Sequence, residues 1–200
     1  MNEYNILIAS VGGQGGLTLS RIIAEAAVNA GFSVRTGETL GMAQRGGSVQ
    51  SFVRIGREVR SPLFPLGTAD ALLAFEAAEA VRSSAFVKKD ALILVDPEVK
   101  QSITTLTKKE KYPPVEGLLE ALRARSRNVR VVEAMREASK LGHPKSANVY
   151  MLGAFCALSD KLPVPSVEEA IANVLGRRSS SAVDVFRKGL EASKAVAREV

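Results

Sequence analysis

Two glycine-rich segments hold the residues of this sequence best suited to bind a charged ligand. The first is Gly12, Gly13, Gln14, Gly15 and Gly16. The second spans residues 41 to 48, and its candidate binding residues are Gln44, Arg45, Gly46, Gly47 and Ser48. Glycine lets backbone N–H groups approach an anion closely, and an arginine fork binds two oxygens at once. Both segments therefore predict contacts with a phosphate or a carboxylate, and together they form the candidate cofactor-binding site.

The first segment departs from the known nucleotide-binding fingerprints. Counted from Gly13, the dinucleotide pattern needs a glycine where Thr18 stands, and the lysine of a P-loop is absent. The acid that would bind a ribose about 20 residues later could only be Glu38, which comes late. Three roles therefore stay open for the first segment: an ordinary tight turn, an anion or nucleotide site, and a contact between subunits. For Arg45 the alternative is a structural role, with hydrogen bonds to backbone carbonyls of its own loop.

The remaining reactive side chains predict structural roles. Cys156 falls on an apolar helical face and indicates a buried thiol rather than a nucleophile. His143 precedes Pro144 and indicates an exposed turn, and Asp96 indicates the turn that follows a strand. A chain with one cysteine and one histidine cannot supply four cluster thiolates, a structural zinc site or an internal disulfide. We therefore expect no metal site in this chain and assign no catalytic residue.

The elements that position the glycines read as an α/β fold. The apolar run 5–11 predicts a buried strand, and apolar residues at helical spacing predict a helix from Leu17 to a cap at Gly31. With a second strand at 32–36, this is a βαβ unit of a parallel sheet. Residues 49–55 predict an extended segment that returns at 58–61 as a β-hairpin.

The rest of the sequence alternates strands and helices and then becomes helical. Apolar runs predict strands at 69–75, 91–95 and 129–132, and a surface loop is expected at 104–114. Helices are expected at 77–87, 118–124, 148–158, 167–175 and 182–196. Ser166 and Glu169 match a capping box for the helix that begins at 167. We predict one Rossmann-like, three-layer α/β domain over residues 1–200, with a mostly parallel sheet, a β-hairpin excursion and a helical C-terminal section.

Composition favours a protein that folds on its own core in a reducing cytoplasm. The chain has 200 residues and no apolar run near the 20 that span a membrane, and its polar start predicts no secretory leader. Its net charge of +6 lies in residues 101–200, which hold 17 Lys/Arg against 11 Asp/Glu. A nucleic-acid-binding domain would use such charge, but aromatics make up only 5% and no reading motif accompanies it. We expect no nucleic acid and no membrane partner.

Taken together, the two glycine segments and the strand that follows resemble a known family. The sequences are NILIASVGGQGG, TGETLGMAQRGGSVQSFVRIG and SPLFPLGTADALLAFE, in this order. They resemble the gamma-type domain of the 2-oxoacid:ferredoxin oxidoreductases, most of all the small subunit of the two-subunit branch that acts on indolepyruvate. The similarity is dense over residues 5–97, and the chain length and helical tail agree with a separate small subunit.

The resemblance implies a non-autonomous subunit of an enzyme that decarboxylates aryl pyruvates. The enzyme would use coenzyme A and yield an aryl-acetyl-CoA, carbon dioxide and reduced ferredoxin. Thiamine diphosphate, Mg²⁺ and the iron–sulfur clusters would belong to a large partner subunit. The glycine loop and the Met42 to Ser48 loop would line the edge that faces this partner, closing the active site or receiving coenzyme A.

Two alternatives to this function stay open. A related member of the family would act on pyruvate or a branched-chain oxoacid instead. A free-standing Rossmann-like oxidoreductase would bind NAD(P) or flavin without a partner.

Overall fold

A six-stranded sheet forms the centre of the molecule, which is described from a computed structural model for residues 3–40, 46–100 and 111–197. The strand order is β2-β3-β1-β4-β5-β6. The strands are β1 (Tyr4–Val11), β2 (Ser33–Leu40), β3 (Ser48–Gly56), β4 (Ala69–Ala74), β5 (Val87–Val95) and β6 (Val129–Val131). Pairing is parallel from β1 through β4 and β5 to β6, and antiparallel on both sides of β3. The predicted mostly parallel sheet is confirmed.

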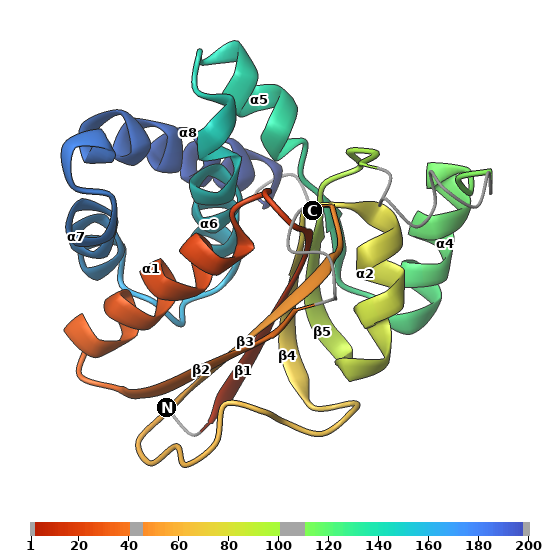
Figure 1. The fold of residues 1–200 in the computed structure, drawn as a ribbon, viewed down its shortest axis with the longest axis horizontal. Coiled ribbons are helices and arrows are strands. Elements are labelled where there is room, and N and C mark those ends of the chain that lie inside the picture. Colours follow the sequence, from red (N-terminus) through yellow and green to blue (C-terminus); the bar gives the residue numbers. More distant parts are fainter. Residues whose placement is uncertain (1–2, 41–45, 101–110, 198–200) are drawn as a thin grey trace.

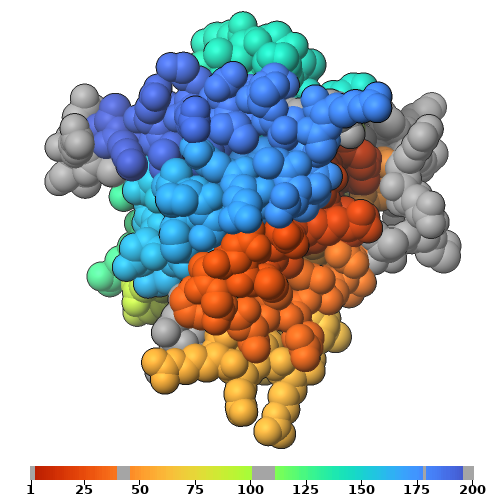
Figure 2. All heavy atoms as spheres, turned by 90° about the vertical axis from the view of Figure 1, so that its left-hand side faces the viewer, coloured from red at the N-terminus to blue at the C-terminus, as the bar shows by residue number. Residues whose placement is uncertain are grey.

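Helices cover both faces of the sheet, as Figure 1 shows. The seven α-helices of the described residues are α1 (Gly16–Asn29), α2 (Ala77–Ser83), α4 (Val115–Arg125), α5 (Ala134–Lys140), α6 (Ala147–Leu158), α7 (Val164–Leu175) and α8 (Ser179–Ala197). The first face packs against α1, α5, α6, α7 and α8, and the second against α2 and α4. Figure 2 shows α7 and α8 in blue on the outside of the first face, with α1 in red to orange below them. The predicted three-layer α/β architecture is therefore confirmed.

Strand β1 runs through the core and serves both faces. Its side chains alternate, because successive residues of a strand point to opposite sides. Ile6 and Ile8 belong to the core under α1 and α6, while Leu7 and Ala9 belong to the core under α2. All four side chains are fully buried, which explains why this stretch of sequence is apolar without a break.

Strand β3 corrects two predictions about the first half of the chain. The residues of β2 and β1 run in the same direction, as the βαβ unit predicts, but β3 lies between them and pairs antiparallel with each. The predicted return strand at 58–61 is wrong, because those residues form bends and irregular chain. The hairpin excursion is instead β2 with β3. Pro62 lies against Gly37 of β2, so the segment after β3 folds back over the sheet without pairing to it.

The helix boundaries are mostly as predicted, with three exceptions. Helix α1 ends at Asn29, where Gly31 has φ +80° and the Phe32 N–H donates to the Ala27 carbonyl at 2.9 Å, so the predicted glycine cap is confirmed. The capping box is wrong, since α7 begins at Val164 and Ser166 lies inside it.

Two further short elements also differ from prediction. Helix α2 ends at Ser83 and continues as a 3₁₀ turn at Ser84–Phe86. The seven-residue α5 has no sequence prediction. Most of the predicted 104–114 loop lies outside the described residues.

Helices α6 and α8 approach one another more closely than side chains would allow. A Cβ added to Gly153 of α6 would lie 2.1 Å from the Phe186 carbonyl oxygen. One added to Gly189 of α8 would lie 2.2 Å from the Tyr150 carbonyl oxygen. The two glycines therefore let the helix backbones touch, and Phe155 and Phe186 are fully buried beside them.

The carboxyl ends of β1, β4 and β5 lie at one edge of the sheet, as expected for parallel neighbours. The start of β3 reaches the same edge, because Val11 is paired with Ser48. Ligands of α/β proteins commonly bind at this edge. The described residues contain no helix long and apolar enough to cross a membrane.

Candidate functional site

The two predicted glycine segments meet at this edge through their backbones. The Gly12 N–H donates to the Gly47 carbonyl at 2.8 Å, and the Gly46 N–H donates to the Gly12 carbonyl at 3.3 Å. Gly46 needs its positive φ of +74° to make this approach. The structure thus brings residues 12–16 together with Gly46, Gly47 and Ser48. Gln44 and Arg45 lie outside the described residues, so their predicted binding roles stay predictions.

Gln14 is a clamp between two strands. Its side-chain Oε1 accepts the Val11 N–H at 2.7 Å, and its Nε2 donates to the Phe75 carbonyl at 2.9 Å. The residue is 8% exposed, so both polar ends are used inside the protein. Gln14 therefore fixes the end of β1 to the end of β4, and its predicted contact with a ligand stays a prediction.

The start of α1 opens on a cavity of about 470 Å³. The cavity is lined by Gly15, Thr18, Gly142, His143, Pro144, Lys145, Ser146, Asn148, Leu175, Ser181 and Ala182. Gly15 is the N-cap residue of α1 in a left-handed conformation, with φ +86°, and as a glycine it provides no side-chain cap. Because N–H groups at a helix start carry partial positive charge, this end of α1 favours an anion. His143 and Lys145 add basic groups to the same cavity.

Asn148 holds the glycine loop from the helical layer. Its Nδ2 donates to the Gly15 carbonyl at 3.3 Å, and a Cβ at Gly15 would lie 2.9 Å from that nitrogen. On the other side of the loop, a Cβ at Gly16 would lie 2.6 Å from Ser10 Oγ. The glycines at these positions are therefore required by close neighbours. The loop is fixed in shape by β1 on one side and α6 on the other.

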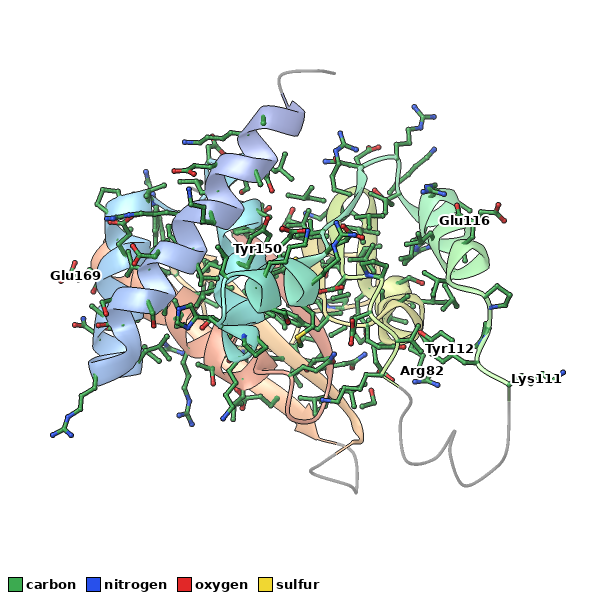
Figure 3. All side chains as sticks on the ribbon, turned by 90° about the horizontal axis from the view of Figure 1, so that it is seen from above. Arg82, Lys111, Tyr112, Glu116, Tyr150 and Glu169 are labelled. Carbon is green, nitrogen blue, oxygen red and sulfur yellow. The ribbon has the colours of Figure 1, made fainter. Side chains whose placement is uncertain are left out.

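A cluster of buried acids lies beside the joined segments, at the start of α2. Glu76 and Glu79 are each 1% exposed. Glu76 caps α2 by accepting the Glu79 N–H at 2.7 Å, and it also accepts the Tyr112 hydroxyl. Glu79 accepts the Ser48 hydroxyl at 2.6 Å and pairs with Arg82. Figure 3 shows Tyr112 and Arg82 on the same side of the molecule.

Burial and the neighbouring groups set the protonation of this cluster. Burial raises the pKa of Glu76, and hydrogen bonds from Tyr112 and the Glu79 N–H act in the opposite direction. Burial and the hydrogen bond to Glu76 raise the pKa of Tyr112. The raised pKa keeps the phenol protonated at neutral pH, so that its hydroxyl can donate a hydrogen bond to the Glu76 carboxyl group.

The other single residues of the sequence analysis have structural surroundings. Asp96 is 3% exposed and accepts the N–H groups of Met135 at 2.8 Å and Glu98 at 3.1 Å. Burial raises the pKa of Asp96 to about 6 and that of the Cys156 thiol to about 12. Glu38 is exposed on β2 and accepts a hydrogen bond from Ser20 at 3.4 Å. His143 lies in an exposed turn as predicted, and that turn forms the wall of the cavity.

Sequence reasoning missed His143, Lys145 and Glu79 as parts of the site. The turn with His143 is more than 120 residues from the glycine loop, and nothing local predicts that the two meet. Glu79 had a usable signal, because it lies in the first turn of α2, the helix that follows buried strand β4 at the carboxyl end of the sheet.

The described residues contain no group of three His, Cys, Asp or Glu side chains that could hold a metal ion.

Comparison with known proteins places the chain in one family. The family model described as pyruvate ferredoxin/flavodoxin oxidoreductase matches residues 5–192. The indolepyruvate oxidoreductase subunit IorB of Archaeoglobus fulgidus is 42% identical, over 94% of this chain and 92% of its own. That of Methanothermobacter thermautotrophicus is 37% identical, over 96% and 98%. The pyruvate/ketoisovalerate oxidoreductases common subunit gamma of Pyrococcus furiosus is 27% identical, over 86% and 88%.

Solved structures agree with the sequence comparison. The gamma subunit of a keto/oxoacid ferredoxin oxidoreductase from Geobacter sulfurreducens has a TM-score of 0.72 and is 25% identical, over 96% of this chain and 99% of that chain. A 2-oxoglutarate:ferredoxin oxidoreductase from Magnetococcus marinus has a TM-score of 0.76 at 20% identity. It is matched over 98% of this chain but only 32% of its own, so there the same fold is one part of a longer polypeptide.

Proposed function

Because this chain belongs to the pyruvate ferredoxin/flavodoxin oxidoreductase family, we propose that it is the small subunit of an indolepyruvate oxidoreductase. The observation that carries the proposal is the contrast between its relatives. Four proteins named indolepyruvate oxidoreductase subunit IorB are 35–42% identical to it, whereas three subunits named for pyruvate and ketoisovalerate are 27–29% identical. An aryl pyruvate therefore fits this chain better than pyruvate or a branched-chain oxoacid.

The reaction would be the oxidative decarboxylation of an aryl pyruvate in the cytoplasm. Coenzyme A would accept the aryl-acetyl group, and ferredoxin would accept the electrons. Thiamine diphosphate with Mg²⁺ would supply the carbanion chemistry, and iron–sulfur clusters would carry the electrons. An iron–sulfur cluster needs four thiolates, whereas Cys156 is the one cysteine of this chain, and the described residues contain no group of three His, Cys, Asp or Glu side chains that could hold a metal ion. We therefore place these cofactors on a large partner subunit.

This chain would contribute an edge that binds the anionic part of coenzyme A against the partner. The cavity at the start of α1 supports this role, because it combines the N-terminal end of α1, where Gly15 provides no side-chain cap, with His143 and Lys145. The joined residues 12–16 and 46–48 would form part of the surface that contacts the ligand. They are held in one shape by Gln14 and Asn148. Such rigidity lowers the cost of ordering a flexible ligand on binding.

The first experiment is isolation of the chain from its host at native expression. We expect a large thiamine- and cluster-containing subunit to purify with it, in a complex that reduces ferredoxin with indolepyruvate faster than with pyruvate. A chain purified alone, or one that binds NAD(P) or flavin, contradicts the proposal.

The second experiment tests the coenzyme A role in that complex. The double variant His143→Ala, Lys145→Ala should raise KM for coenzyme A about tenfold, the value of one lost charged contact, with KM for the oxoacid unchanged. Lys188→Ala is the matched control, because Lys188 is an exposed base on α8 that pairs with Glu191. An unchanged KM for coenzyme A would remove the cavity from the binding role.

A further inference from the structure

We propose that Glu79 is a positioning residue that sets the geometry of the joined glycine segments, and so controls how this edge receives coenzyme A. The inference rests on the proposed function for its ligand, and on contacts of Glu79 for its cause. Glu79 itself would not touch the ligand. It would act through Ser48.

Glu79 is a buried acid at a position where an apolar side chain would pack equally well. Its carboxylate is 1% exposed, although a charged group loses favourable hydration when it is removed from water. Replacing a buried ion pair with apolar groups of the same volume is often neutral or stabilising. Helix α2 already buries Ala77 and Ala80 against the sheet, so an apolar residue at this position would suit that face. The carboxylate is therefore better explained by what it holds.

The two acids of the cluster have separate partners. Glu76 caps α2 and binds Tyr112, so its contacts hold α2 and the chain before α4. Glu79 is the acid that reaches the site, because its Oε2 accepts the Ser48 hydroxyl at 2.6 Å. Its Oε1 pairs with Arg82, one turn later on α2, which fixes the carboxylate from behind. This division makes Tyr112 a matched control for Glu79.

Ser48 transmits the position of Glu79 to both glycine segments. It follows Gly47 directly, and the Gly47 carbonyl accepts the Gly12 N–H at 2.8 Å. Ser48 is also paired with Val11, the last residue before the glycine loop. A shift of the Ser48 side chain therefore moves the start of β3 and the start of the glycine loop together. Because Glu79 lies on a rigid helix, it fixes both relative to α2.

The test is a double-mutant cycle in the complex with the large subunit. Glu79→Gln and Ser48→Ala should each raise KM for coenzyme A about five- to tenfold with kcat changed less than twofold, as expected for the loss of a charge-assisted hydrogen bond. The double variant should be no worse than either single variant, because both remove the same contact. Tyr112→Phe should leave KM for coenzyme A unchanged. Additive effects, an unmoved KM or an equal effect of Tyr112→Phe would overturn the proposal.

Amide hydrogen exchange on the full chain alone separates this inference from the proposed function. In Glu79→Gln and in Ser48→Ala, the Gly12 and Gly46 N–H groups should exchange about tenfold faster, with the core strands unaffected. Unchanged exchange at both glycines overturns the positioning role whatever the enzyme does. A different result is faster exchange in the variants together with a complex that does not oxidise indolepyruvate. That result supports the positioning role and contradicts the proposed function.

Discussion

The helices on the two faces of the sheet are held in different ways. On the first face, α6 and α8 touch backbone to backbone at Gly153 and Gly189, and the contacts around them are apolar. On the second face, α2 is fixed at its start by Glu76 and Glu79, whose partners are hydroxyl, guanidinium and backbone groups. Apolar packing fills volume, whereas hydrogen bonds fix direction.

The difference matches what each region has to do. The helical layer must be stable, and the close packing of α6 against α8 buries large apolar side chains such as Phe155 and Phe186. The edge beside α2 must hold two loops in one geometry, which requires directional contacts from a rigid element. We therefore expect substitutions in the first region to change stability, and substitutions in the second to change binding at a smaller cost in stability.

The largest expected effect is at the contact of α6 with α8. In Gly153→Ala, the new Cβ would lie 2.1 Å from the Phe186 carbonyl oxygen, so the helices must separate. We expect a loss of more than about 3 kcal/mol in the free energy of unfolding, at the upper end of overpacking effects. Urea denaturation followed by circular dichroism measures it.

The control for that substitution is Gly117→Ala on α4. No atom lies within 4 Å of a Cβ at Gly117, and its helical backbone accepts alanine. Stability should rise by roughly 0.5–1 kcal/mol from helix propensity alone. Equal losses in the two variants would show that the close approach of α6 and α8 is not what stabilises the helical layer.

A medium effect is expected where the edge joins the core, at Gln14. Gln14→Leu keeps the volume of the side chain but leaves the Val11 N–H and the Phe75 carbonyl unpaired. We expect a loss of about 2–3 kcal/mol, because both groups are buried. Asn173→Ala, which removes an exposed side-chain bond to Glu25, should change stability by less than about 0.5 kcal/mol. A stable Gln14→Leu protein with weakened coenzyme A binding would instead support the predicted ligand contact of Gln14.

The smallest effect concerns Asp96, which links the edge to the helical layer by accepting the Met135 N–H at the start of α5. Burial raises its pKa in the folded protein to about 6, above the ordinary value of 3.8. Between these two pH values the folded state therefore binds more protons than the unfolded state. Its contribution to stability therefore falls as pH rises from 4 to 6, by roughly 1.5 kcal/mol between pH 4.5 and 6. Asp96→Asn should lack this decline, and identical pH profiles for the two proteins would contradict it.

Much of the fold could be predicted because the relevant patterns are local. The unbroken apolar run before Gly12 and the helical spacing up to Gly31 define β1 and α1. The position of β3 could not be predicted, because its alternating side chains could pair with any neighbouring strand. Its insertion between β1 and β2 depends on pairs that run from Tyr4 with Ile55 to Val11 with Ser48, which are far apart in the sequence. Helix α5 was missed because it has seven residues and its start is bonded by Asp96, 39 residues earlier in the chain.

The site could be predicted only in part, for the same reason. Two glycine segments of unusual composition predicted a shared edge, and the Gly12 to Gly47 contact confirms that they meet. The role of Gln14 could not be predicted, because a glutamine side chain between glycines can either contact a ligand or join two strands. The basic wall with His143 and Lys145 depends on how α6 packs beside α1, which no local pattern describes.

The bond from Asn148 to Gly15 also has a consequence for the order in which the protein is assembled. It joins residues 133 positions apart, which is long for a chain of this size. Contacts of such separation close a large loop and form late in folding, after local helices and hairpins. During synthesis, the glycine loop leaves the ribosome well before α6 exists. The binding edge is thus completed only when the C-terminal helices dock, so a chain interrupted before α6 would lack both the Asn148 bond and the helices that cover the first face of the sheet.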